Sequence, residues 1–389
     1  MPHLAEDALT QLHCKITIMD FEIEFLPVGD TSKAGDSIVV RYGSNGQYEI
    51  IIIDGGTDDA GAAMVEHIKR HYGPQAYINH VICTHPDADH ACGLRNVLKE
   101  LPVGTLWLHG VWHHAAEMLP YFEDKRWTVD GLQTKIRNEY SVISELIDLA
   151  DAQKTPVHEP FQGQQIGPFT VLSPTRWAYL RLVSQFRKTP DPDIDQLKAD
   201  NMWIEGAKKS FLGGILGSLV EKAAEWMPEN WDIELLKDGA ITAAENESST
   251  ILYGRFGTSS VLLTADAGVN ALWWAMDYAD ANQIDLSTLD LVQVPHHGSR
   301  SNVGPTVLNR LLGPRLPKGS PEKRRAIVCA PKDDASHPRK MVMNAFLRRG
   351  APVRKTQGSS YRFFTGMPQR ADMVAAVPFG FFDQVEAYD

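Results

Sequence analysis

Residues 84–90, "THPDADH", constrain this chain more than any other stretch of its sequence. They bring His85, Asp87, Asp89 and His90 together within seven positions. The apolar segment "INHVIC" precedes them, and the segment "GLRNVLKEL" that follows has apolar residues at helical spacing. We therefore predict a strand, a tight polar turn on which His85 and Asp87 point the same way, and a helix with Asp89 at its start as a natural N-cap.

Neither turn formation nor stability requires two histidines at this turn. A dinuclear metal site does, because each ion needs several nitrogen or oxygen ligands that converge from one rigid edge. The alternative interpretation is a solvated loop that is merely rich in Asp and His.

Three further apolar segments end in ionisable residues. "IIIIDGG" ends in Asp54, "LLTADAG" in Asp266, and "VQVPHHGS" in His296 and His297. Each resembles a buried strand that finishes at the edge of a sheet, where loops carry function. Four such endings, counting the first, predict that these side chains gather in one site.

The order of predicted elements indicates an α/β (α+β) fold. Strands with helices on their outer faces in both halves predict a four-layer αββα sandwich. The segment "NMWIEGAKKSFLGGILGSLVEKAAEWM" reads as one long or broken helix inside a helical insertion, and we expect the sandwich to fold without residues 178–243. The predicted divisions are an N-terminal half (18–174), the insertion (175–245), a C-terminal half (246–366) and a tail (367–389).

Composition excludes some classes of protein. The chain is 43% hydrophobic and 22% charged, its start lacks the features of a signal peptide, and no apolar run reaches the roughly 18 residues of a membrane span. The four cysteines show no paired spacing, so we expect a cytoplasmic protein with reduced thiols and no membrane partner. Cys92 fits a small packed residue better than a metal ligand.

Charge is distributed unevenly along the chain. The segment 300–355 contains 14 Lys and Arg residues against three acidic residues, although the whole chain has a net charge of −11. Such asymmetry predicts a basic surface that meets an anion, and the alternative is a solvated basic face.

Several of these motifs together resemble the metallo-β-lactamase fold superfamily and, within it, the hydrolase domain of the competence protein ComEC and its stand-alone relatives. The resemblance runs from about residue 21 to 364, apart from the insertion. The motifs that carry it are "FLPVGD", "IIDGG", "THPDADHACGL", "NESSTILYGRFGTSSVLLTADA", "VPHHGS" and "SHPRKMVMNAFLRRGAPVRKT".

The resemblance implies two divalent metal ions, zinc or manganese. It places His85 and Asp87 on the first ion. It places Asp89 and His90 on the second, with Asp266 bridging both.

One histidine of the adjacent pair closes the second site. His297 is the favoured ligand, and His296 is either the alternative ligand or a supporting group. Asp54 would orient the motif turn by accepting hydrogen bonds. Most of the superfamily has histidine in place of Asp87 and another histidine after the strand "FTVLSPT", and both are missing here. We therefore expect an oxygen-rich first site that favours manganese over zinc.

The implied chemistry is hydrolysis by a metal-activated water. Asp89 or Asp266 would orient this water, and His337 would protonate the leaving group or bind a phosphate oxygen. Ser299, with the backbone amides after "HHG", and a helix N-terminus at 338–341 would bind an anion. The histidines His109, His113 and His114 follow another strand and are weaker candidates for the site.

The basic segment favours a phosphodiester substrate, either DNA or RNA, and hence a phosphodiesterase or nuclease. A lactone or other ester is the alternative substrate. A third hypothesis is a component of a multi-protein defence system, in which the insertion or the tail "GFFDQVEAYD" docks a protein partner.

Overall fold

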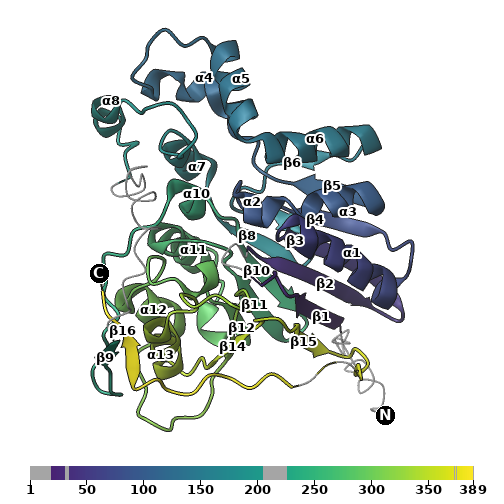
Figure 1. Ribbon diagram of the computed structural model, residues 1–389, viewed down its shortest axis with the longest axis vertical. Coiled ribbons are helices and arrows are strands. Elements are labelled where there is room, and N and C mark those ends of the chain that lie inside the picture. The colour runs from purple at the N-terminus through teal and green to yellow at the C-terminus, as the bar shows by residue number, and fades with distance from the viewer. Residues whose placement is uncertain (1–18, 31–34, 205–225, 372, 374, 389) are drawn as a thin grey trace, which may run out of the picture.

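The computed structural model describes residues 19–30, 35–204, 226–371, 373 and 375–388. Two sheets of seven strands each lie face to face, and helices cover the outer face of both (Figure 1). This arrangement confirms the predicted four-layer αββα sandwich. No helix in these described residues is long and apolar enough to cross a membrane.

The first sheet is antiparallel at one side and parallel at the other. In sheet order its strands are β15 (Tyr361–Thr365), β1 (Asp20–Phe25), β2 (Ser37–Ser44), β3 (Gln47–Gly55), β4 (Ile78–Ile82), β5 (Val103–Trp107) and β6 (Val157–His158). Its helices and short turns are α1 (Asp58–Tyr72), α2 (Ala88–Ala91), α3 (Leu94–Glu100), η1 (Val111–His114), α4 (Ala115–Met118), η2 (Leu119–Tyr121), α5 (Val129–Glu139) and α6 (Ser141–Gln153).

The second sheet has its parallel strands in the C-terminal half of the chain. In sheet order its strands are β14 (Val353–Lys355), β13 (Arg325–Val328), β12 (Leu291–Gln293), β11 (Ser259–Leu263), β10 (Ile251–Phe256), β8 (Phe169–Ser173) and β7 (Gln165–Ile166). Its helices and short turns are α11 (Val269–Ala281), η3 (Leu286–Thr288), η4 (His296–Gly298), α12 (Pro305–Leu312) and α13 (Lys340–Arg348).

Strand β3 illustrates why the sandwich forms. Its run of four isoleucines is buried on both faces, as expected for a strand covered on either side. Ile51 and Ile53 join the core between the two sheets, whereas Ile50 and Ile52 pack in the core beneath the helices. The alternation follows from the two-residue period of a strand, and it leaves the next residue, Asp54, at the carboxyl end of β3.

The predicted insertion contributes to the core of the domain. Its described elements are α7 (Arg176–Val183), α8 (Ile194–Ala199), β9 (Trp226–Pro228) and α10 (Ala244–Glu247). Tyr179, Leu182 and Phe186 are fully buried in the same core as α1 and α3. This burial argues against the expectation that the sandwich folds without residues 178–243, although the flanking strands β8 and β10 do pair directly.

The long helix predicted across residues 201–227 lies mostly outside the described residues, which omit 205–225. At its described end the prediction is wrong, because Trp226 and Met227 belong to strand β9. That strand pairs with β16 (Gln384–Glu386) of the C-terminal tail. Val385 of β16 is fully buried, so the tail packs on its own domain. A protein partner for the insertion or the tail stays a prediction.

Candidate metal centre

Four histidines surround one carboxylate, that of Asp266. Its Oδ1 lies 3.4 Å from Nε2 of His90 and 3.9 Å from Nε2 of His297. Its Oδ2 lies 3.8 Å from Nε2 of His85 and 3.5 Å from Nε2 of His296. Each oxygen therefore faces its own pair of imidazoles, which is the arrangement that a carboxylate needs in order to bridge two cations.

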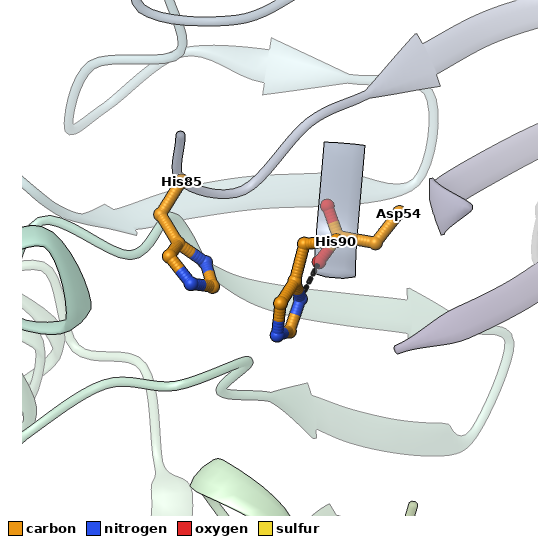
Figure 2. A group of neighbouring side chains, drawn as sticks. All are labelled: Asp54, His85 and His90. Atoms are coloured by element: carbon orange, nitrogen blue, oxygen red, sulfur yellow. Dashed lines mark hydrogen bonds and ion pairs between the residues drawn. The ribbon is translucent and has the colours of Figure 1, made fainter. Parts of the chain in front are cut away.

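Two more carboxylates of the motif turn join this group. Oδ2 of Asp87 lies 4.0 Å from Nε2 of His85. Asp89, His90 and His297 bring one ligand atom each to within 4.8 Å of one another. Figure 2 shows the rings of His85 and His90 pointing the same way from the turn after β4. The structure thus brings together all the residues predicted as metal ligands.

Every one of the four histidines is held through its other ring nitrogen. Such contacts set the tautomer and leave Nε2 with a lone pair for a metal. The Nδ1 atoms contact Thr84 Oγ1 at 3.1 Å (His85), Asp54 Oδ2 at 2.7 Å (His90), Asn302 Oδ1 at 2.8 Å (His296) and Cys329 O at 2.9 Å (His297).

Asp54 controls two of these orientations. Its Oδ1 accepts the backbone N–H of Thr84 at 2.8 Å, and its Oδ2 accepts the hydroxyl of Thr84 at 2.6 Å and Nδ1–H of His90 (Figure 2). Because the Thr84 hydroxyl donates to Asp54, it accepts the hydrogen of Nδ1 from His85. These contacts support the orienting role predicted for Asp54.

A divalent cation fits the donor atoms that these contacts leave over. Within the described part of the chain, Nε2 of His85, His90 and His297 and Oδ1 of Asp266 are buried and have no hydrogen-bond partner. A buried polar atom without a partner costs about 1–3 kcal/mol. Four such atoms directed at one another are costly in an ordinary core, whereas imidazole nitrogens and carboxylate oxygens are suitable ligands for zinc or manganese.

The charges of the centre act on its histidines in opposite directions. Burial would lower the pKa of His90, but Asp266 and Asp54 outweigh it and raise that pKa well above its usual value, so a cation at Nε2 of this ring would replace a proton. Burial, reinforced by the nearby His90, lowers the pKa of His85 well below its usual value, so this imidazole is neutral. Burial alone would raise the pKa of Asp266, but His296, His90 and His297 outweigh it and hold that pKa well below the usual range. Asp266 is therefore an anion in contact with a neutral ligand, His85.

The backbone is strained at the same place. Asp54, Ala265, His296 and His297 have φ values of 53°, 46°, 48° and 54°, the left-handed region that non-glycine residues seldom adopt. Each such residue costs on the order of 1–3 kcal/mol, and such strain clusters at functional sites. His296 and His297 are candidate ligands, Asp54 orients His90, and Ala265 directly precedes Asp266.

Sequence reasoning missed Asp36, which belongs to the centre. It is 2% exposed, and its carboxylate lies within 4.8 Å of ligand atoms of His90 and Asp266. Nε2 of Gln293 donates to it at 2.7 Å. The signal available in the sequence was a glycine and an acid, Gly35 and Asp36, directly before a strand. The glycine is needed because a Cβ atom at position 35 would lie 1.6 Å from the carbonyl oxygen of Asp89.

His337 lies beside the centre, as the sequence predicted. Its ring is 6.5 Å from that of His296 and nearly parallel to it, at 18°. Its Nδ1 is 3.2 Å from Oδ2 of Asp334, and among the described residues only this ring nitrogen makes a hydrogen bond. Nε2 makes no hydrogen bond to a described residue.

Both predicted anion-binding elements need correction. Ser299 is 7% exposed, and its backbone N–H donates to the carbonyl oxygen of His296 at 2.8 Å, while the N–H of Ser301 donates to the Ser299 hydroxyl at 3.2 Å. These backbone amides are therefore already bonded within the turn and are not free for an anion. At the start of α13 the N–H of Lys340 binds both carboxylate oxygens of Glu386, at 3.1 and 3.0 Å. The chain's own tail therefore fills the helix N-terminus expected to bind an external anion.

Other predictions near the motif turn are also revised. The helix begins at Ala88, so its N-cap residue is Asp87 and not Asp89, and no side-chain hydrogen bond caps it. His109 and His114 lie 3.9 and 2.9 Å from Glu159 and do not belong to the ligand groups around Asp266.

Much of the charge in the basic segment is neutralised inside the molecule. Arg348 and Arg349 are buried and pair with Glu229 and Glu234 of the predicted insertion, at 3.1 and 2.7 Å. Arg324 is 6% exposed and donates to a backbone carbonyl. The segment therefore serves partly to anchor the insertion, which weakens the expectation of a continuous basic surface for a polyanion.

Comparisons with known proteins find a similar family and solved structures that resemble this chain. Residues 30–166, which include the motif turn, match the family model of the metallo-beta-lactamase superfamily. Solved structures with a similar fold include the metallo-beta-lactamase fold protein YhfI from Bacillus subtilis (10% identity, 88% of this chain and 99% of that chain, TM-score 0.40) and unliganded yeast PDE1 (12% identity, 89% and 100%, TM-score 0.42). No curated protein matches the chain.

Proposed function

We propose that this protein is a metal-dependent hydrolase whose two divalent ions share Asp266. The observation that carries the proposal is the division of the Asp266 oxygens between two pairs of histidines. The first ion would take His85, Asp87, His296 and Asp266, and the second would take His90, Asp89, His297 and Asp266.

In this assignment both histidines of the "HHG" turn are ligands. His296 supplies the nitrogen that the first site lacks after the strand "FTVLSPT". Each ion then has two imidazoles and two carboxylates, a mixed set that suits zinc as well as manganese. The first site is less oxygen-rich than the sequence led us to expect.

Hydrolysis of a phosphodiester is the reaction that we propose. Divalent ions held in this way supply hydroxide near neutral pH and stabilise negative charge on the substrate. Asp89 or Asp266 would orient the attacking water, and Asp89 would take its proton. The water oxygen forms a bond to phosphorus, the bond from phosphorus to the leaving oxygen breaks, and Nε2 of His337 gives that oxygen a proton.

The choice of a phosphodiester over a lactone rests on two hydrogen-bonding side chains beside the centre. His337 stands on one side of the ligands, next to His296, and Arg187 stands on the other, in contact with Asp87. An ester without charge has no need of either group. The motifs shared with the ComEC hydrolase domain support the same choice.

The test uses metal-depleted protein reloaded with Zn²⁺ or Mn²⁺. Bis(p-nitrophenyl) phosphate, single-stranded DNA, RNA and a simple lactone are offered as substrates, and bound metal is counted by mass spectrometry. We expect two ions per chain and metal-dependent cleavage of the phosphodiesters. Cleavage of the lactone alone would overturn the substrate class, and failure to retain metal would overturn the proposal as a whole.

A further inference from the structure

Arg187, in the loop after α7, reaches from the predicted insertion to the metal centre. Its Nη2 lies 2.7 and 2.6 Å from the two oxygens of Asp87. Its Nε lies 3.2 Å from Oε1 of Glu245, and its backbone N–H donates to the same oxygen at 2.6 Å. The guanidinium is thus held on two edges. Its Nη1 makes no hydrogen bond to any described residue, and the side chain is 47% exposed.

Glu245 holds this arginine in place. It is 1% exposed, and Oε1 also accepts the hydroxyl of Tyr140 at 3.1 Å. A carboxylate that is so deeply buried needs a cation beside it. Arg187 is therefore kept in one position next to the candidate ligand Asp87 and is not a freely moving surface side chain.

Arg187 also lines a cavity of about 620 Å³. It lies between the loop after α7 and the region of α5, and its wall includes Trp127, Lys135, Arg187 and Lys188 together with Glu123 and Glu139. This volume is within the range of about 300–1,000 Å³ that binds small organic molecules. The wall also includes Asp124 and Asp191, so its acids slightly outnumber its bases. Such a wall attracts a long chain of phosphates less than a wholly basic groove would, and its carboxylates can accept hydrogen bonds from the amino groups of a heterocycle.

We propose that Arg187 binds a non-bridging phosphate oxygen of the substrate and that the cavity holds the remainder of a nucleotide-sized phosphodiester. The inference rests on the proposed function and deepens it by naming the size class of the substrate. The phosphodiester lies between the ligands and Nη1 of Arg187, and a base or sugar lies along Trp127. A nucleic acid strand is the substrate class that this arrangement disfavours.

The experiment compares Arg187→Ala and Arg187→Gln with wild type on thymidine dinucleotide, bis(p-nitrophenyl) phosphate and a long single-stranded DNA. We expect KM for the dinucleotide to rise about tenfold to a hundredfold, because a charge-assisted hydrogen bond is lost. Binding of a phosphorothioate dinucleotide, measured by calorimetry on protein of known metal content, should weaken by a similar factor. Arg176→Ala is the matched control, because Arg176 pairs with Glu117 and does not line the cavity.

A second variant, Trp127→Ala, tests the cavity itself. It should weaken the dinucleotide about fivefold to a hundredfold through lost stacking, and leave the metal content of the protein unchanged. Unchanged dinucleotide binding in both arginine variants would overturn the role of Arg187. A wild type that cleaves long DNA far more efficiently than the dinucleotide would overturn the size class. Either result would leave open the metal-dependent hydrolysis of bis(p-nitrophenyl) phosphate by the wild type. That reaction tests the proposed function separately.

Discussion

Nδ1 of His90 lies 2.7 Å from Oδ2 of Asp54, and both side chains are completely buried. Asp54 lies at the end of β3, and His90, 36 positions later, lies in α2, which follows the neighbouring parallel strand β4. The contact fixes which nitrogen of His90 faces Asp266. Asp54 thus decides how the candidate metal ligand His90 points.

Replacing Asp54 by Asn should weaken metal binding by about tenfold to a hundredfold, the usual cost of losing such a supporting carboxylate. The amide keeps the shape but removes the charge that accepts from both Thr84 and His90. Calorimetric titration with Zn²⁺ or Mn²⁺ measures the change. Asp58→Asn, at the exposed start of α1, is the control and should bind as wild type does.

Asp266→Ala should remove both ions and all hydrolysis, because its two oxygens face both pairs of histidines. Metal content by mass spectrometry and turnover of bis(p-nitrophenyl) phosphate are measured on the same sample. A variant that retains two ions and full activity would rule out a shared ligand at this position.

His337→Ala should lower turnover of the thymidine dinucleotide by about a hundredfold to ten-thousandfold, the range for loss of a general acid. Affinity for a phosphorothioate dinucleotide should change little, because this ring would contact the leaving oxygen and does not line the cavity. A leaving group such as p-nitrophenolate needs no proton, so its cleavage should be much less affected. Equal loss on both substrates would contradict the role of a proton donor.

Phe186→Ala should lower the free energy of unfolding by about 3–5 kcal/mol, the usual cost of emptying a buried aromatic position. Phe186 is fully buried although it lies in the predicted insertion. Urea denaturation measures the loss. Ile194→Ala, at a 40% exposed position of α8, should cost much less. A small effect at Phe186 would restore the idea of a removable insertion.

Glu24 makes the stability of the fold depend on pH in the acidic range. Burial would raise its pKa, but His67, Tyr72 and Arg370 together lower it from 4.5 to about 2. A depressed carboxyl pKa contributes stability that is complete above the unfolded value and is lost as pH falls from about 4.5 towards 2. The full difference is about 3 kcal/mol at most, because one pKa unit corresponds to about 1.4 kcal/mol.

The corresponding variant is Glu24→Gln. It should be less stable than wild type at pH 7, and its stability should fall less steeply between pH 5 and pH 3. Denaturant titrations at several pH values give both quantities. Glu100→Gln, which breaks an exposed pair with Lys69, should reproduce the wild-type pH dependence.

Local sequence determined the strand endings and the types of ligand in this protein. Side-chain alternation and helical spacing are properties of neighbouring residues, so "IIIIDGG" and "THPDADH" reveal where a strand stops and which groups follow. The sandwich followed from the same patterns. Asp54, His85 and His90 could therefore be placed together from the sequence alone.

Only the tertiary structure decided the contacts between distant segments. Arg187 meets Asp87 across 100 positions, Asp36 approaches His90 from another strand, and Glu386 fills the N-terminus of α13. No local pattern encodes such pairs, because each depends on how whole layers pack. For the same reason the insertion appeared separable in sequence, while its buried side chains proved to complete the core.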